Sequence, residues 1–211
     1  MKLYDGAWAP SPRRVRMFLA EKRIDVERVV VDLKHGEHLR PDYAGINAQR
    51  QLPALLLDDG TLIDDSIAIC RYFEALHPDP PLFGANPREI GLVEAWLRRI
   101  EHDCFQAVVL SFRNKVSVFA GRAVSGQWPP IEQIPALIDR GRCMWEAFAA
   151  VLDAHLADRR HIAGDLFTMA DIAALVAIDF GIDTRLPDPR DHHAALARWH
   201  AEVSARPSAA A

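Results

Sequence analysis

Short apolar runs alternate with helically spaced apolar positions through residues 1–79. Residues 3–4 predict a first short strand, and residues 11–22 carry apolar side chains at the spacing of one helical face. Residues 26–31 first alternate and then become continuously apolar, a pattern typical of a buried parallel strand. A short helix is predicted near residues 41–43. Together these patterns predict a β-α-β unit followed by a brief helical turn.

A hairpin and a helix are predicted next. Leu52-Pro53 precedes the apolar run 54–57, and proline suits the start of a strand because it cannot donate to a sheet ladder. Asp59-Gly60 separates this run from residues 61–63, which is a hairpin signal. The polar residues 64–66 then suit the N-terminus of an apolar helix, whose exposed N–H groups form an anion site.

The order of these elements is typical of a thioredoxin-like domain, because β-α-β connections produce parallel strands covered by helices. Three prolines within residues 77–81 end the pattern, and residues 88–211 show only helical periodicity. We therefore predict an α/β thioredoxin-like N-terminal domain and an all-α C-terminal helical domain. The expected boundaries are residues 1–79 for the first domain, 80–87 for the linker and 88–211 for the second domain.

The helical half contains one well-defined helix start. Thr168 and Asp171 have the spacing of a capping box, with Asp in the place of the usual Glu. Long helices are predicted after Arg88 and over residues 134–156, and a last helix is predicted over residues 191–205. A loop containing Trp128 separates the first two of these helices.

Composition narrows the class of protein. The net charge of the 211 residues is −4, so no basic surface for nucleic acid is indicated. An odd number of widely spaced cysteines (Cys70, Cys104 and Cys143) is not a disulfide framework and favours a reducing compartment. All three fall on helical patterns and are expected to be small buried hydrophobic residues.

We find no signal peptide and no membrane-length apolar run, so a soluble cytoplasmic protein is expected. The histidines lack partners at metal-ligand spacing, and no metal is expected.

One segment carries a family resemblance. Residues 47–55 read Asn-Ala-Gln-Arg-Gln-Leu-Pro-Ala-Leu, and residues 65–69 read Asp-Ser-Ile-Ala-Ile. This segment resembles the glutathione-binding half of the cytosolic glutathione S-transferases, in which N-P-x-G-x-V-P-x-L precedes a hairpin and E-S-x-A-I. Residues 168–171 also resemble the buried cap of that family's helical domain. The resemblance covers nearly the whole chain.

The resemblance implies a function and a set of binding residues. It implies that glutathione is the co-substrate and that Leu52-Pro53 is a cis bond, with Gln51 and Leu52 meeting the cysteine and glycine parts of glutathione. Asp65 and Ser66 would hold the γ-glutamyl end, although Asp65 is one methylene shorter than the usual Glu. Arg40 matches a position that contacts the glycine carboxylate, or else is an exposed loop arginine.

The resemblance further implies a hydrophobic electrophile in a pocket lined by the helical domain, by Phe105, Val109, Phe112 and Trp128. It also implies a homodimer. Neither nucleic acid nor a membrane is expected as a partner.

The catalytic position departs from the family pattern. Aligning Arg14-Val15-Arg16 with the family's R-V-R places the usual Tyr, Ser or Cys donor at Ala9, so an enzyme cysteine is not expected to act. Ser11 is the nearest hydroxyl, and two roles remain open for it. It can donate a hydrogen bond to the glutathione thiolate, or it can be the N-cap of the first helix, with Pro12 at the first helical position. The nearby arginines are expected to be solvated.

The sequence is compatible with three functions. The first is a glutathione transferase that stabilises the thiolate of glutathione and conjugates it to a hydrophobic electrophile. The second is a non-catalytic binding protein with the same fold, which the alanine at position 9 suggests. The third is a glutathione-dependent reductase of peroxides or disulfides, in which glutathione itself attacks.

Overall fold

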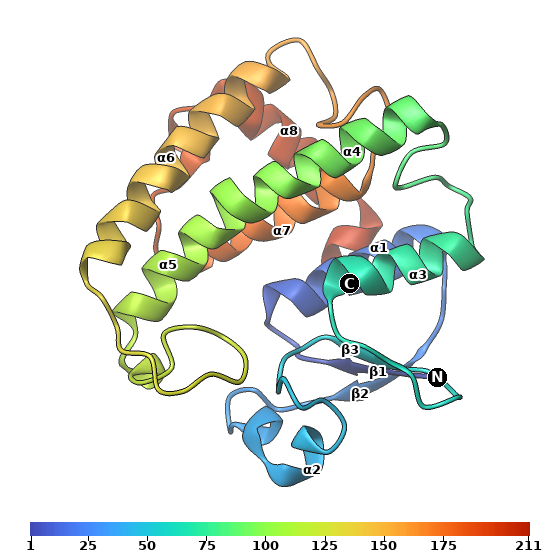
Figure 1. The fold of residues 1–211 in the computed structure, drawn as a ribbon. Helices are drawn as coiled ribbons and strands as arrows, with labels where there is room; N and C mark the ends of the chain where they lie inside the picture. The colour runs from blue at the N-terminus through green and yellow to red at the C-terminus, as the bar shows by residue number, and fades with distance from the viewer. The chain divides into compact units, whose positions relative to one another are not determined.

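A four-stranded sheet organises the N-terminal part of the computed structural model, which describes residues 1–211 (Figure 1). The strand order is β2-β1-β3-β4. Strand β1 pairs parallel with β2 and antiparallel with β3, and β3 pairs antiparallel with β4. The predicted α/β domain and its hairpin are therefore confirmed. The strands are β1 (Lys2–Asp5), β2 (Glu27–Val30), β3 (Ala54–Leu56) and β4 (Leu62–Ile63).

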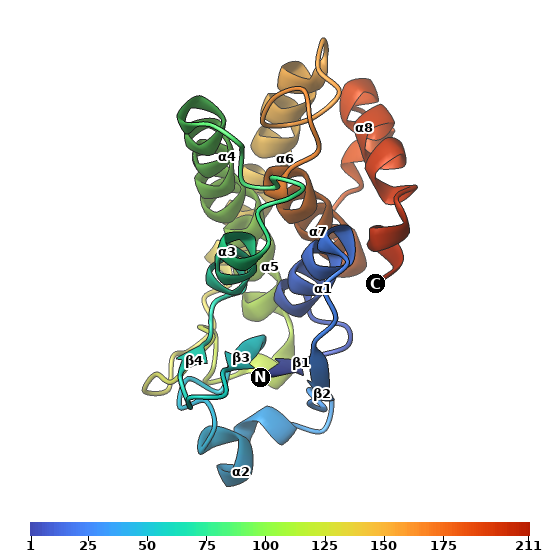
Figure 2. The same ribbon diagram turned by 90° about the vertical axis from the view of Figure 1, so that its right-hand side faces the viewer.

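Helices cover both faces of this sheet. Helices α1 and α3 lie side by side on one face, and the short helix α2 lies on the other (Figures 1 and 2). The core between the sheet and the two longer helices contains Leu3, Phe18, Leu55, Ile69 and Phe73, all of which are buried. The helical segments are α1 (Pro10–Lys22), the 3-10 turn η1 (Glu37–Leu39), α2 (Pro41–Ala44) and α3 (Ser66–Leu76).

Strand β2 differs from the sequence prediction. It pairs parallel with β1 as predicted, but it lies at the edge of the sheet rather than inside it. Val30 is accordingly 64% exposed. The apolar side chains of β2 suggested a buried strand. The sequence pattern does not show the order of the strands, so it could not indicate that β2 lies at the edge of the sheet, beside β1.

The remaining helices form the second part of the chain. Helix α7 is buried over almost its whole length and contacts α4, α5, α8 and the π-helix η2. Helices α4 and α5 are joined through one π-helical stretch without a break in the chain's helical course. The segments are α4 (Pro87–Arg99), the π-helix η2 (Ile100–Phe105), α5 (Gln106–Lys115), η3 (Ser117–Phe119), α6 (Ala136–Leu156), α7 (Met169–Asp183), η4 (Pro189–Asp191), α8 (Ala194–Ser204) and η5 (Pro207–Ala210).

The chain divides into two compact units, each held together by contacts among its own residues. The first comprises residues 1–80 together with 125–129 and 210–211, and the second comprises residues 81–124 and 130–209. Residues 125–129, which the sequence pattern places in the helical half, thus group with the sheet-containing unit. No helix is both long enough and apolar enough to cross a membrane.

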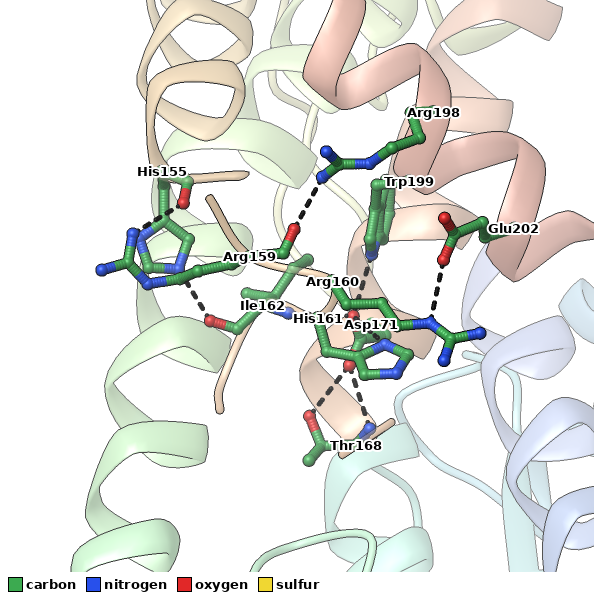
Figure 3. A network of polar contacts seen from close by, with 10 residues as sticks. All are labelled: His155, Arg159, Arg160, His161, Ile162, Thr168, Asp171, Arg198, Trp199 and Glu202. Atoms are coloured by element: carbon green, nitrogen blue, oxygen red, sulfur yellow. Dashed lines mark hydrogen bonds and ion pairs between the residues drawn. The ribbon is translucent and has the colours of Figure 1, made fainter. Parts of the chain in front are cut away.

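A fully buried carboxylate organises the start of α7 (Figure 3). Asp171 Oδ2 accepts hydrogen bonds from the backbone N–H of Thr168 at 2.9 Å and from its hydroxyl at 3.2 Å. Its Oδ1 accepts from the N–H of Ile162 at 3.0 Å and from Trp199 Nε1 at 2.9 Å. The predicted capping box is confirmed. The same side chain also ties α7 to the preceding loop and to α8.

Replacing this carboxylate should weaken the fold strongly. Asp171→Ala leaves four buried donors without their acceptor, so we expect the free energy of unfolding to fall by about 3–5 kcal/mol. Denaturant titration of the purified variant measures the loss. The exposed Asp165→Ala is the matched control and should change stability by no more than about 0.5 kcal/mol. Equal losses in the two variants would contradict the role given to Asp171.

Candidate active site

Helix α1 begins two residues earlier than the sequence suggests. Its N-cap is Ala9, Pro10 is its first helical residue, and the N–H of Arg13 donates to the carbonyl of Ala9 at 3.2 Å. Proline suits the first position because its φ is already helical and it lacks the N–H that would be unsatisfied there. The prediction that Ser11 caps the helix is therefore wrong, because Ser11 is the second helical residue.

In the first turn of α1, only one backbone N–H is left without a hydrogen-bond partner. Pro10 and Pro12 have no N–H, and the N–H of Arg13 is already bonded to Ala9. The N–H of Ser11 remains, and neither it nor the Ser11 hydroxyl has a hydrogen-bond partner within the chain. Ser11 is half-buried. Both donors at the positive end of α1 thus belong to a single residue.

An ion pair from the same helix holds the loop that leads to Ser11. Arg16 Nη1 lies 2.7 Å from Asp5 Oδ1, and Arg16 Nη2 donates to the carbonyl of Ala7 at 2.9 Å. Both side chains are buried, so the expectation of solvated arginines is wrong for Arg16. The reason is that the carboxylate at the end of β1 lies directly beneath the helix and neutralises the guanidinium.

The expectation of a solvated side chain is also wrong for Arg14. It is only 2% exposed, and its Nη1 donates to the hydroxyl oxygen of Ser66 at 3.1 Å. Since Ser66 Oγ accepts this bond, its own proton stays available to a second acceptor. Ser66 opens α3 and is 4% exposed. The contact joins the first turns of α1 and α3 and places a buried positive charge beside the Ser66 hydroxyl.

The N-terminus of α3 retains further polar groups. Asp65 is its N-cap, and Oδ1 of Asp65 accepts from the N–H of Ala68 at 2.8 Å. The second carboxylate oxygen of Asp65 and the N–H groups of Ser66 and Ile67 have no partner within the chain. This end of α3 can therefore donate to an anion, while Asp65 accepts from a cation beside it.

Two buried side chains shape the loop before β3. Tyr43 donates its hydroxyl to the carbonyl of Gln51 at 2.6 Å, and Asn47 Nδ2 donates to the same carbonyl at 3.1 Å. Burial raises the pKa of Tyr43, so its hydroxyl stays protonated as a donor. Neither residue was predicted from the sequence to have a role in the site. Asn47 is the first residue of the motif at residues 47–55, so this motif could have indicated it. No sequence motif indicated Tyr43.

The loop ends in the cis bond that the resemblance implied, between Leu52 and Pro53. The backbone N–H and C=O of Leu52 form no hydrogen bond within the chain. Leu52 is half-buried against the loop after β1, where a Cβ on Gly6 would lie 3.1 Å from Leu52 Cδ1. Leu52 therefore lies next to the segment that leads to Ser11.

Most of the predicted site residues are thus connected. Leu52 contacts the loop before α1, Ser11 opens that helix, and Arg14 one turn later reaches Ser66. Arg40 lies between η1 and α2, is exposed, and makes no side-chain hydrogen bond or ion pair that joins it to the others.

Residues 125–129 also reach this unit. A Cβ on Gly126 would lie 3.0 Å from Gln51 Nε2 and 3.3 Å from Trp128 Nε1, so the segment packs against Gln51. The indole of Trp128 is 62% exposed and donates to the carbonyl of Ser125 at 2.8 Å. The three other expected pocket residues belong to the helical unit, where Phe112 is the centre of an aromatic cluster with Phe119 and Phe180 at ring-centroid distances of 5.2 and 5.5 Å.

The cysteines are all free, and none lies in the loop before α1. Cys70 and Cys104 are buried as expected, and burial raises the pKa of the Cys70 thiol. Cys143 is exposed, so the expectation of a third buried cysteine is wrong. Cys143 lies on the outward face of α6. The apolar residues of this helix did not show in the sequence which of its faces is exposed.

Comparison with known proteins identifies the family. The model of the glutathione S-transferase N-terminal domain matches residues 8–76, and that of the C-terminal domain matches residues 145–207. Glutathione S-transferase 2 of Saccharomyces cerevisiae is 34% identical over 214 residues, covering 99% of this chain and 87% of that protein.

Solved structures agree with this result. A glutathione S-transferase domain-containing protein of Marinobacter aquaeolei has a TM-score of 0.86 at 33% identity and covers 99% of both chains. A glutathione S-transferase of class Gtt2 from Vibrio parahaemolyticus has a TM-score of 0.83 at 33% identity, covering 99% of this chain and 95% of that one. A sheet with a cis-proline loop, joined to a helical unit, therefore defines a glutathione-transferase fold. The chain belongs to the glutathione S-transferase family, which confirms the resemblance and the transferase assignment.

The three thiols should differ sharply in reactivity. Only the thiolate is alkylated, and burial disfavours it at Cys70. We expect iodoacetamide to modify Cys143 in the folded protein and to modify Cys70 and Cys104 only after unfolding, as measured by mass spectrometry. Cys143→Ser is the control and should remain unmodified while folded. Modification of Cys70 in the folded protein would contradict the described burial.

Proposed function

We propose that this glutathione transferase ionises the thiol of glutathione at Ser11. The observation that carries the proposal is the first turn of α1, where two prolines leave the N–H and the hydroxyl of Ser11 as the donors without partners. Ala9 stands where the family's donor side chain usually lies. Ser11 supplies a replacement hydroxyl two residues further along the chain.

The backbone of glutathione would be held at the cis-proline loop. The N–H and C=O of Leu52 can pair with the backbone of the cysteinyl residue, since neither has a partner within the chain. Tyr43 and Asn47 position these groups through their hydrogen bonds to the neighbouring carbonyl of Gln51. Gln51 and Leu52 with Pro53 thus form the central part of the proposed binding site.

The two ends of glutathione would be held by charge. Ser66 can donate its hydroxyl proton and its N–H to the γ-glutamyl carboxylate, with Arg14 behind the hydroxyl, while Asp65 accepts from the γ-glutamyl ammonium group. Arg40 is exposed and unpaired, so its guanidinium can approach the glycine carboxylate. Each contact joins opposite charges or a helix N-terminus and an anion.

The chemical step requires a thiolate. Loss of the S–H proton to solvent leaves a negative sulfur, which the N–H and O–H of Ser11 stabilise together with the positive end of α1. The sulfur lone pair then attacks an electrophilic carbon. A C–S bond forms, and the leaving group departs with the electron pair of the bond that breaks. No enzyme thiol takes part.

The electrophile is proposed to be hydrophobic. Phe105, Val109 and Phe112 are half-buried, so part of each apolar side chain remains accessible in the helical unit. Such a lining binds apolar molecules with little discrimination by hydrogen bonding.

We also propose a homodimer, the commonest oligomeric state for a soluble protein that self-associates. Leu76 on α3 and Ile90 and Leu92 on α4 are large exposed apolar side chains that association would cover.

Ser11→Ala tests the thiol activator cleanly. Because Ser11 is not the helix cap, this change should leave stability nearly unaltered. We expect kcat/KM with a generic aryl halide to fall roughly 10²-fold, as for loss of one donor to a developing anion. The apparent pKa in the pH–rate profile should rise towards about 8.5, the value of a free thiol.

Ser11→Thr provides the matched control, because it retains a hydroxyl and should keep most of the activity. If the pH–rate profile of folded Ser11→Ala overlays that of the parent protein, the hydroxyl is not the activator. Retention on glutathione resin without turnover by the parent protein would instead support the non-catalytic binding protein.

Ser66→Ala should weaken glutathione binding. The loss should be about 0.5–1.5 kcal/mol for one hydrogen bond, and more where the carboxylate charge strengthens it. Isothermal titration calorimetry with glutathione gives the change in Kd directly. The exposed Ser117→Ala is the control and should bind like the parent. An unaltered Kd for Ser66→Ala would remove Ser66 from the binding site.

A further inference from the structure

The loop between α5 and α6 (Figure 1) contains a short segment that groups with the first unit. We call this segment, residues 125–129, the strap. It groups with residues 1–80, whereas the residues on both sides of it in the sequence group with the helices. The strap is therefore built from the second half of the sequence but belongs to the unit that contains the candidate active site.

The strap lies directly against Gln51. A Cβ on Gly126 would be 3.0 Å from Gln51 Nε2 and 3.7 Å from Gln49 Oε1, so a glycine leaves room for the amide of Gln51. Gly126 also has a φ of 100°, which favours glycine. The side-chain amide of Gln51 forms no hydrogen bond within the chain. This amide is therefore free to bind a ligand that lies beside the strap.

Hydrogen bonds fix the base of the loop that carries the strap. The N–H of Ala123 donates to the carbonyl of Ile131 at 3.0 Å, and the N–H of Ile131 donates to the carbonyl of Gly121 at 3.0 Å. Arg113 Nε, on α5, donates to the carbonyl of Ala123 at 3.1 Å. Because these bonds close the loop at its base, the strap can move without disturbing α5 or α6.

The strap itself is weakly held. Its one hydrogen bond is internal and runs from Trp128 Nε1 to the carbonyl of Ser125 at 2.8 Å. No residue from 124 to 130 forms another hydrogen bond within the chain. The indole of Trp128 is 62% exposed. A segment with a fixed base, few hydrogen bonds and an exposed large apolar side chain has the properties of a lid that closes on a bound ligand.

We propose that the strap closes over glutathione at Gln51 and slows its release. In the closed state the indole of Trp128 turns from solvent onto the bound ligand, and Gly126 leaves the amide of Gln51 in place beside it. This inference rests on the proposed function, because Gln51 lies in the loop that would hold the cysteine and glycine parts of glutathione. It adds a second segment, far from Gln51 in the sequence, that determines how long glutathione stays bound.

Hydrogen exchange measured by mass spectrometry tests the closure. The ligand is S-methylglutathione, whose small S-substituent does not extend the molecule towards the strap, at a concentration that saturates the parent protein by calorimetry. We expect amide exchange over residues 124–128 to slow at least about 5-fold in the saturated protein, because closure restricts the opening of the strap. Exchange at Ala123 and Ile131 should change little, since their N–H groups are already bonded.

Trp128→Ala tests the contribution of the indole. The dissociation rate of S-methylglutathione, measured by NMR line-shape analysis of the ligand, should rise at least about 5-fold, the factor expected for the loss of one aromatic anchor. Gly126→Ala should also raise it, because the added Cβ meets the amide of Gln51 and the φ is unsuited to alanine. Val118→Ala is the control, since it removes an exposed apolar side chain outside the strap and should leave the rate unaltered.

The outcomes distinguish the strap from the proposed function. A parent protein that does not bind S-methylglutathione overturns the proposed function and the strap with it. Binding with unaltered exchange over residues 124–128 overturns the strap alone. The strap is also overturned if folded Trp128→Ala releases the ligand at the parent rate, or if Val118→Ala accelerates release equally.

Discussion

The candidate active site depends on two buried arginines that α1 directs to opposite sides. Arg16 pairs with Asp5 and holds the loop that follows β1, while Arg14 reaches Ser66 at the start of α3. Burying a guanidinium is costly unless its partners are well placed, so each contact restricts the position of α1. Together they fix the first turn of α1 between the loop and α3, and this turn carries Ser11.

The same turn carries the donors to which we assign activation of the thiol in the proposed function. Proline at the first and third helical positions removes two donors that a helix N-terminus usually offers, and the capping residue Ala9 has no polar side chain. What remains is one residue, Ser11, with two donors. We infer that the proline spacing, more than the serine by itself, concentrates the positive end of the helix at one point.

The sequence pattern predicted those structural elements that are determined by residues close together in the sequence. The hairpin follows from Asp59-Gly60, and the capping box follows from the spacing of Thr168 and Asp171, so both were predictable. The burial of Arg14 was not, because its partner Ser66 lies 52 residues away in the sequence. The helix start was ambiguous because Pro10 and Pro12 both suit a first turn. The edge position of β2 depends on the strand order, which the hydrophobic pattern does not encode.

A crystal structure with glutathione bound would test the central claim most directly. The account predicts that the sulfur lies within hydrogen-bonding distance of both the N–H and the hydroxyl of Ser11, with the γ-glutamyl carboxylate at Ser66. A sulfur atom that faces away from α1, or that is contacted only by water or by the helical unit, would contradict the assignment of Ser11 as the group that activates the thiol.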